Sequence, residues 1–318
     1  MKNLQKSIKT SKKDGKILVQ RRAKPVKSDK GKRRVVLKGK NKTASAKSKD
    51  VRDLIFKDGR YKLIAQLGEG GMGAVYRAED MFLNVDVAIK VLPAELTRDH
   101  AAIEEFKNEA KVIMTLSHDH IVRLHHFDIK CGCLFLIMEY VNGKNLRCIL
   151  NEVGPLSMDA VLDIANSCAS ALDYAHGCGI IHRDLKPANL MVNEKSVLKI
   201  VDFGTARHGD ASLKADDLYV MGTPTYTSPE QFMGYSPEPR ADVYSLGAIV
   251  YELLTGNPIY PFDSTAEAII GGPPALESSD IPYAVESVVI QAFAREVNER
   301  WPSAGFFYQK LCQAVEQS

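Results

Sequence analysis

The alternation of apolar and polar residues changes part-way along the chain. Between residues 59 and 140, short apolar or alternating runs are separated by glycines, which predicts β-strands. The predicted strands are YKLIAQLGEG, GAVYRAED, VDVAIKVL and CLFLIMEYV, at residues 61–70, 73–80, 85–92 and 133–141. From Leu146 onward the apolar spacing is typical of helices. A strand-rich part followed by a helical part indicates an α+β protein with two lobes.

One helix interrupts the strands, and four more are predicted after them. In residues 99–116 apolar residues recur at three- and four-residue spacing, which predicts a helix with one buried stripe. The stripe consists of Ile103, Phe106, Ala110, Ile113 and Met114. The later helices are SMDAVLDIANSCASALDYAHGC, ADVYSLGAIVYELLTG, IPYAVESVVIQAFARE and SAGFFYQKLCQAVEQ. Ser157 is the predicted N-cap of the first, and the second is so apolar that we expect it to be buried on most sides.

Charge is divided between a basic tail and an acidic body. Residues 1–50 contain 19 Lys or Arg and 3 Asp, a net charge of +16, whereas the remaining residues carry a net charge of −13. Because the tail has no aromatic residue and little apolar periodicity, we predict that residues 1–55 are disordered. The tail could be a solvated linker, fold back on the acidic body, be phosphorylated, or bind nucleic acid or an anionic membrane non-specifically.

The sequence contains no recognisable targeting signal and no cysteine pattern typical of disulfides. No apolar segment follows the basic start, which argues against a secretory signal, and no run reaches the roughly 18 apolar residues of a membrane span. The six cysteines show no disulfide framework, so we expect reduced thiols and a cytoplasmic protein. Cys131-Gly132-Cys133 lacks the second pair of a metal site, and a tight hairpin turn is the favoured interpretation.

The stretch LGEGGMGAVYRA places glycines at 68, 70 and 73 in G-x-G-x-x-G spacing. A dinucleotide site would need a helix after these glycines, but another strand is predicted there. No G-K-[ST] follows, which excludes a P-loop. A glycine-rich strand–turn–strand lets backbone N–H groups approach phosphate oxygens, so we interpret this stretch as a lid over a triphosphate.

Two charged residues lie in apolar surroundings further along. Lys90 lies in the apolar strand VAIK, so its side chain must either point away from the core or meet an acid. Glu109 lies beside the apolar stripe of the helix at 103–116 and is one candidate partner. The alternative is that Glu109 is a solvated charge on the helix.

The stretch IIHRDLKPANLMV carries His182, Arg183, Asp184, Lys186 and Asn189 between two short predicted strands, 180–181 and 190–192. Pro187 should keep the intervening turn from becoming a helix. A polar hairpin loop is the simple interpretation. A rigid loop that presents an acid, a base and an amide at the edge of a core is the other.

Nine segments decide between these interpretations, because they occur in one fixed order: LGEGGMGAVY, VAIK, Glu109, MEYVNG, HRDLKPAN, DFG, GTPTYTSPE, DVYSLG and NERW. From about Tyr61 to Leu311 the chain resembles eukaryotic-type Ser/Thr protein kinases, most of all their bacterial members. The resemblance implies the bilobal kinase fold. We therefore expect a catalytic domain at 61–313, with an N-lobe at 61–140 and a C-lobe at 141–313.

The resemblance also implies a role for each polar residue. Asp184 would accept the proton of the substrate hydroxyl, and Lys186 would contact the transferred phosphate. Asn189 and Asp202 would each bind Mg²⁺, while Lys90, positioned by Glu109, would hold the ATP phosphates. The other implied ATP-binding residues are Leu67, Gly68, Glu69, Gly70, Gly71, Met72, Gly73, Ala74, Val75, Ala88, Met138 as gatekeeper, Glu139, Val141 and Met191. Val75, Ala88 and Met191 are equally plausible as ordinary core.

The implied activity is transfer of the γ-phosphoryl group of Mg-ATP to Ser or Thr hydroxyls of proteins, including autophosphorylation. Lys186 and Thr223 resemble the Ser/Thr-specific members. A nucleotide-binding pseudokinase scaffold is disfavoured because Lys90, Asp184, Asn189 and Asp202 are all present. A small-molecule kinase is disfavoured by the intact GTPTYTSPE segment.

Further residues are assigned to regulation and bracing by the same resemblance. Arg183 marks kinases in which a phosphate on the activation loop pairs with this arginine. Asp216 and Asp217 occupy the region where relatives carry phosphorylated threonines, so they could replace the phosphate, or could simply be solvated; Ser212 is an alternative phosphosite. We expect Glu230 to pair with Arg300, and Asp242 to accept backbone N–H groups of the catalytic loop. Ser228 departs from the Ala more usual in the family.

Overall fold

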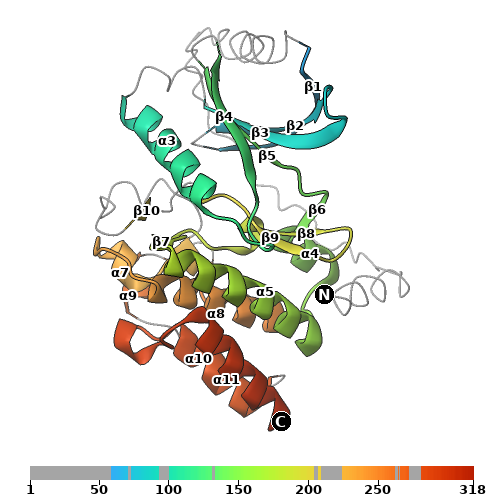
Figure 1. The fold of residues 1–318 in the computed structure, drawn as a ribbon. Coiled ribbons are helices and arrows are strands. Elements are labelled where there is room, and N and C mark those ends of the chain that lie inside the picture. The colour runs from blue at the N-terminus through green and yellow to red at the C-terminus, as the bar shows by residue number, and fades with distance from the viewer. Residues whose placement is uncertain are drawn as a thin grey trace, which may run out of the picture.

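The fold has a strand-rich lobe and a helical lobe (Figure 1). The computed structural model describes residues 59–70, 73–92, 100–130, 133–203, 207–208, 224–261, 264, 266–271 and 281–318. In Figure 1 the sheet and helix α3 form the upper lobe, and helices α4 to α11 form the lower one. The predicted two-lobed α+β architecture is confirmed.

The upper lobe is built on a five-stranded antiparallel sheet of order β1-β2-β3-β5-β4. Its strands are β1 Tyr61–Gly70, β2 Gly73–Asp80, β3 Val85–Val91, β4 Leu124–Lys130 and β5 Cys133–Glu139. Four of the five were predicted; β4 was not. Lys130 pairs with Cys133 across β4 and β5, which supports the predicted hairpin, although the turn residues Cys131 and Gly132 lie outside the described residues.

The two faces of this sheet belong to different apolar clusters because side chains alternate along a strand. On β3, Val87, Ile89 and Val91 pack on one face, against residues that include Tyr61 and Tyr76. Ala88 points to the other face. Lys90 shares the parity of Ala88 and is only 7% exposed.

Helix α3, His100–Thr115, packs against the second face. Phe106 and Ala110 of its predicted stripe are buried in this cluster. Met114 was predicted to belong to the stripe, and this is wrong, because its side chain is 68% exposed. The last turn packs on the core of the lower lobe through Val112, Ile113 and Leu116, which leaves Met114 facing outward.

The lower lobe contains helices and two small sheets. The helices are α4 Leu146–Val153, α5 Met158–Gly177, α7 Pro229–Phe232, α8 Arg240–Thr255, α9 Ala266–Ile270, α10 Tyr283–Ala292 and α11 Ala304–Glu316, with 3₁₀ turns η2 Pro187–Asn189, η3 Pro224–Tyr226 and η4 Val297–Glu299. One sheet joins β6 Gly143–Asn145, β8 Leu190–Asn193 and β9 Leu198–Ile200; the other joins β7 Ile180–Ile181 and β10 Arg207–His208. Helix α5 has Ser157 as its N-cap residue, as predicted.

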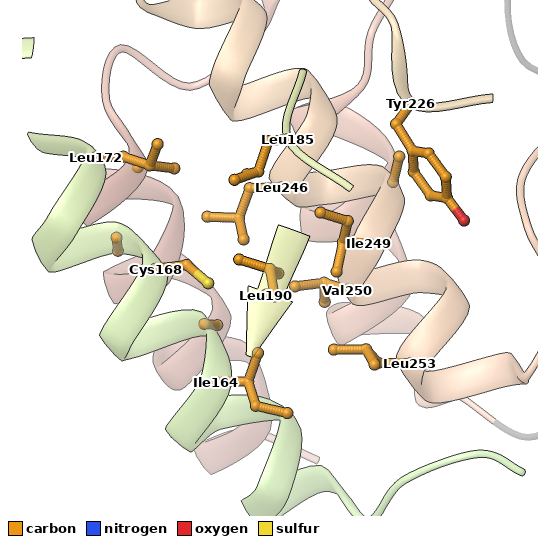
Figure 2. Packing of buried hydrophobic residues seen from close by; sticks show 14 of the residues in the cluster. Ile164, Cys168, Leu172, Leu185, Leu190, Tyr226, Leu246, Ile249, Val250 and Leu253 are labelled. Atoms are coloured by element: carbon orange, nitrogen blue, oxygen red, sulfur yellow. The ribbon is translucent and has the colours of Figure 1, made fainter. Parts of the chain in front are cut away.

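Helix α8 is the centre of the lower core. Thirteen of its sixteen residues are buried, as its apolar sequence predicted. Figure 2 shows side chains of α5 and α8 converging on Leu185 and Leu190, which are fully buried. The polar stretch at 182–189 is therefore anchored by one apolar side chain within it, Leu185, and by one directly after it, Leu190.

A buried thiol in this core gives a first testable expectation. Burial raises the pKa of Cys168 to about 12, so almost no reactive thiolate exists at mildly alkaline pH. Cys148 and Cys178 are exposed. With iodoacetamide at pH 8 we expect these two to be alkylated quickly and Cys168 only after unfolding, as read by peptide mass spectrometry. Equal labelling of Cys168 in the folded protein would contradict this packing.

Among the residues that the structure describes, no helix has both the length and the apolar character to cross a membrane.

Candidate active site

The polar stretch between β7 and β8 is not a hairpin. Strand β7 pairs with β10, whereas β8 pairs with β6 and β9, so the two flanking strands belong to different sheets. The expectation that Pro187 prevents helix formation is also wrong, because η2 begins at Pro187. Proline is accepted at the first position of a helical turn, where its missing N–H has no partner to lose.

The backbone of this stretch is held by a buried carboxylate. Asp242 of α8 is fully buried and accepts the N–H of His182 at 2.8 Å and that of Arg183 at 2.9 Å, as predicted. Arg183 has a left-handed φ of 68°, which a non-glycine residue adopts only under constraint. Burial acts to raise the pKa of Asp242, but the contacts with His176 and His182 outweigh it and lower that pKa. Asp242 thus stays ionised as an acceptor.

The backbone carbonyl of Arg183 is also held by a hydrogen bond. Gln231 Nε2 donates to the Arg183 oxygen at 3.0 Å, and Ser228 Oγ donates to Gln231 Oε1 at 2.9 Å. Sequence reasoning missed Gln231 and noted Ser228 only as a departure from the family pattern. The Ser228 hydroxyl orients the Gln231 amide, and this amide links α7 to the polar stretch.

Asp184, Lys186 and Asn189 lie together. Lys186 Nζ donates to Asp184 Oδ2 at 2.7 Å. Asn189 Nδ2 donates to the Asp184 carbonyl at 2.8 Å and to Oδ2 at 3.3 Å. One carboxylate, one ammonium group and one amide therefore meet within hydrogen-bonding distance, with the two charged groups partly exposed at the edge of the lower lobe.

Asp202 and Lys90 join this group from the other side. Lys90 Nζ donates to Asp202 Oδ1 at 2.9 Å, across 112 residues of sequence. The Val201 N–H donates to the Asn189 carbonyl at 2.9 Å, which ties the two segments together. The Asp202 side chain is half exposed, yet the protein around it acts to raise its pKa; Lys90, His182 and Lys186 outweigh this effect and hold that pKa below its usual range. Like Arg183, Asp202 has a left-handed φ, here 63°.

Apolar side chains from both lobes meet beside these charges. Ala88, Met138 and Val141 are buried in one cluster, and Val75 and Met191 pack against it from β2 and β8. The backbone N–H of Glu139 donates to the Arg123 carbonyl at 2.9 Å, so a backbone contact from Glu139 to a ligand would use its carbonyl. Its carboxylate pairs with Lys199 at 2.9 Å.

Comparison with known proteins identifies this arrangement. The family model described as the protein kinase domain matches residues 61–299. The chain belongs to the protein kinase family. A probable serine/threonine-protein kinase of Clostridium acetobutylicum is 33% identical over 258 residues, which are 79% of this chain and 39% of that protein. The serine/threonine-protein kinase PknB of Mycobacterium leprae is 38% identical over 256 residues, which are 77% of this chain and 41% of that protein.

A solved structure agrees with the family assignment. The PknI kinase domain of Mycobacterium tuberculosis, crystallised as a point mutant, superposes with a TM-score of 0.64 at 27% identity. The match covers 80% of this kinase and 96% of that chain. The kinase spans about two fifths of the length of the curated relatives it matches.

The glycine-rich stretch of the kinase lies on two paired strands, as predicted. Gly68 pairs with Val75 and Gly70 pairs with Gly73, so the strand predicted after the glycines is present. Leu67 and Glu69 lie on the exposed part of β1, and Ala74 is the second residue of β2. Gly71 and Met72 lie outside the described residues.

Several predicted residues of the kinase, or their side chains, lie outside the described part of the structure. Glu109 lies in α3, as expected, but its side chain is outside the described part of the structure. The residues proposed for regulation, Ser212, Asp216 and Asp217, are outside it too, as are Thr223 and the basic tail.

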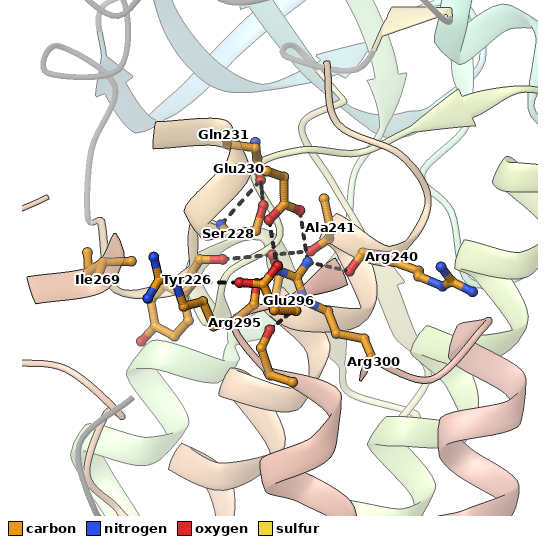
Figure 3. A network of polar contacts seen from close by, with 12 residues as sticks. Tyr226, Ser228, Glu230, Gln231, Arg240, Ala241, Ile269, Arg295, Glu296 and Arg300 are labelled. Carbon is orange, nitrogen blue, oxygen red and sulfur yellow. Dashed lines mark hydrogen bonds and ion pairs between the residues drawn. The ribbon is translucent and has the colours of Figure 1, made fainter. Parts of the chain in front are cut away.

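The segment beyond them is held by buried ion pairs. Arg300 donates to both carboxylate oxygens of Glu230, at 2.8 and 2.7 Å, which confirms the predicted pair (Figure 3). A second set was not predicted: Arg147 donates to Glu252 at 2.6 Å and also contacts the Tyr226 hydroxyl. Glu252 is the only acid within the apolar run GAIVYELL, and an acid in that position is a signal for a buried partner.

Proposed function

We propose that this kinase transfers the γ-phosphoryl group of ATP to Ser or Thr hydroxyls of proteins, its own chain among them. The convergence of two ion pairs, Lys90 with Asp202 and Asp184 with Lys186, supports this reaction most strongly. Phosphoryl transfer depends mainly on positioning and on positive charge where negative charge develops, and these pairs supply both.

Asp184 acts as the base in this proposal. The hydroxyl oxygen of the substrate forms a bond to the γ-phosphorus as the bond from phosphorus to the bridging oxygen of ADP breaks. The hydroxyl proton passes to the Asp184 carboxylate. Lys186 lies 2.7 Å from that carboxylate and would stabilise the charge on the transferred group.

The donor set fits Mg²⁺. Asp202 carries a half-exposed carboxylate whose lowered pKa keeps it ionised, and Asn189 would offer its amide oxygen because its nitrogen donates to Asp184. Both are hard oxygen ligands, the type that Mg²⁺ prefers. Bound Mg²⁺ would neutralise charge on the phosphate oxygens.

The nucleotide would lie between the lobes. Val75, Ala88 and Met191 would enclose the adenine ring, with Met138 as gatekeeper and backbone contacts from Glu139 and Val141. The stretch from Leu67 to Val75 would cover the phosphates, and Lys90, positioned by Glu109, would hold them.

One assay tests the proposal directly. The kinase is incubated with labelled ATP, Mg²⁺ and myelin basic protein, and the phosphorylated amino acids are then identified. Phosphoserine and phosphothreonine are expected, together with labelling of the kinase itself. A nucleotide-binding scaffold would bind ATP without transferring label, and a tyrosine kinase would yield phosphotyrosine. The limits of the catalytic domain at 61–313, the cytoplasmic location and the binding of anionic partners by the basic tail stay predictions.

Replacing Lys90 by Met should lower kcat/KM for phosphoryl transfer about 10²-fold or more, because the phosphates lose a preorganised cation and Asp202 loses its partner. Steady-state kinetics measure this effect. Lys107→Met, on the exposed face of α3, removes the same charge and should have little effect. Equal kinetics for the two variants would remove Lys90 from the site.

A further inference from the structure

The peptide group that joins Arg183 to Asp184 is held at both of its polar atoms. Gln231 Nε2 donates to its carbonyl oxygen at 3.0 Å, and its N–H group donates to His182 Nδ1 at 3.3 Å. This peptide group lies directly before the Cα atom of Asp184, so its orientation sets the direction in which the Asp184 side chain leaves the backbone. The two contacts that fix this peptide group therefore also fix the direction of the proposed base.

The backbone at Arg183 is strained and depends on support from both sides. Its φ of 68° is a conformation that a non-glycine residue keeps only when its surroundings hold it. Asp242 of α8 accepts the Arg183 N–H at 2.9 Å and so fixes the preceding peptide group. Gln231 of α7 fixes the following one. Without the contact from α7, the peptide group between residues 183 and 184 could rotate toward a less strained backbone, and Asp184 would turn with it.

The Gln231 side chain is itself held firmly in place. Gln231 is only 2% exposed, and the fully buried Ser228 donates its hydroxyl to Gln231 Oε1 at 2.9 Å. The neighbouring Glu230 forms the buried ion pair with Arg300, and Figure 3 shows Ser228, Glu230 and Gln231 together at the start of α7. Because these contacts already order the Gln231 side chain, its hydrogen bond to the Arg183 carbonyl costs little further side-chain entropy.

Capping of helix α7 explains only part of this arrangement. Ser228 is the N-cap residue of α7, Gln231 is its third residue, and the two form a capping box. In a capping box the Gln side chain accepts a hydrogen bond through its oxygen, which is the atom that Ser228 contacts here. The Nε2 group is not needed for the cap, yet it donates to Arg183 across 48 residues of sequence. This second contact indicates a role outside α7.

We propose that Gln231 is a positioning residue for phosphoryl transfer, which fixes the peptide group between Arg183 and Asp184 so that the Asp184 carboxylate faces the substrate hydroxyl. The inference rests on the proposed function, in which Asp184 is the base. A displacement of about 1 Å in a group of this kind can lower a rate about 10²-fold. Because Gln231 acts through Asp184 and not on the nucleotide, it should affect the rate of transfer and leave the affinity for ATP unchanged.

The variant Gln231→Met tests this role, because Met has a similar volume and no N–H to donate. In single-turnover measurements with saturating Mg-ATP and myelin basic protein, we expect the rate of phosphoryl transfer to fall about 10- to 100-fold. The Kd of Mg-ATP should stay at the parent value. In an Asp184→Asn background, Gln231→Met should cause no further loss, because a residue that acts through the Asp184 carboxylate has nothing left to position.

Three further variants separate this role from capping and from a general loss of stability. Gln231→Glu keeps the oxygen that completes the capping box but lacks the N–H donor, so it should be as slow as Gln231→Met. Ser228→Ala removes only the orienting hydroxyl and should lower the rate about 3- to 10-fold, which gives the answer if the Gln231 variants do not fold. Gln291→Met is the matched control and should keep the parent rate, because Gln291 Nε2 also donates to a backbone carbonyl, that of Glu299 at 3.2 Å, but from the exposed surface of α10.

Several results would overturn the inference. A folded Gln231→Met variant that transfers phosphate as fast as the parent, or in its place an equally fast Ser228→Ala variant, would remove the role. Full activity of Gln231→Glu would make Gln231 a helix cap only. Loss of rate by the same factor in the parent and in the Asp184→Asn background would make its role purely structural. A parent that transfers no label to myelin basic protein would overturn the proposed function together with this inference, whereas an active parent confines each of the other failures to Gln231.

Discussion

Replacing Asp184 by Asn is expected to lower kcat for phosphoryl transfer by about 10²- to 10⁴-fold, the usual contribution of a positioned general base. The amide has the shape of the carboxylate and keeps an oxygen that can accept from Lys186 and Asn189, which lie 2.7 and 3.3 Å from Asp184 Oδ2. What it loses is the capacity to take the proton of the substrate hydroxyl. Single-turnover measurement with saturating Mg-ATP isolates this step.

The affinity for ATP separates a catalytic role from a structural one. Asp184 is not among the proposed nucleotide ligands, so the Kd of Mg-ATP and the thermal unfolding midpoint should stay close to those of the parent. Asp159→Asn makes the same change of charge in the first turn of α5 and should be fully active. If Asp184→Asn retained most of the turnover, the base would have to be sought elsewhere.

Replacing Glu230 by Ala should lower the free energy of unfolding by about 3–5 kcal/mol. Arg300 is fully buried on its side chain, and its guanidinium spans both oxygens of Glu230. Among the described residues, removing the carboxylate leaves this buried cation with three backbone carbonyls as hydrogen-bond acceptors, those of Ala294, Arg240 and Arg295 (Figure 3). Urea unfolding of the purified kinase, followed by circular dichroism, gives the value.

A surface ion pair provides the control for this substitution. Lys144 and Glu152 approach to 2.6 Å, as closely as Arg300 and Glu230, but both are about half exposed. Water screens such a pair, so Glu152→Ala should change the free energy of unfolding by no more than about 1 kcal/mol. Similar losses for the two variants would mean that burial is not what makes the Glu230 pair important.

The strands and helices that were predicted best from the sequence are those that are buried along most of their length. Strand β3 and helix α8 are of this kind, because the first alternates between two apolar faces and the second is buried nearly all round. Strand β4 was missed because it lies at the sheet edge, where LHHFDIK leaves most of its side chains exposed. Met114 was misplaced because the helical period cannot tell which lobe the end of α3 will contact.

The residues of the candidate site could be named from the sequence, but of their contacts only that of Asp242 with the N–H groups of residues 182 and 183 was predicted. Ordered motifs predicted Lys90, Asp184, Asn189 and Asp202 as site residues, yet no spacing in the sequence could show that Lys90 meets Asp202 across 112 residues. The Ser228–Gln231 contact with Arg183 likewise depends on how α7 folds back on the polar stretch. Such contacts follow from tertiary packing, which local patterns do not encode.

The carboxylate of Asp242 accepts hydrogen bonds from main-chain amides, and this limits which amino acids are compatible with positions 182 and 183. Because these hydrogen bonds involve the backbone N–H groups of residues 182 and 183 and not their side chains, many amino acids are compatible with them. Proline is the one amino acid that cannot form these hydrogen bonds at either position, because it has no backbone N–H to donate. At 183, where φ is 68°, glycine or asparagine would fit the backbone more easily than arginine, and arginine is retained at a conformational cost.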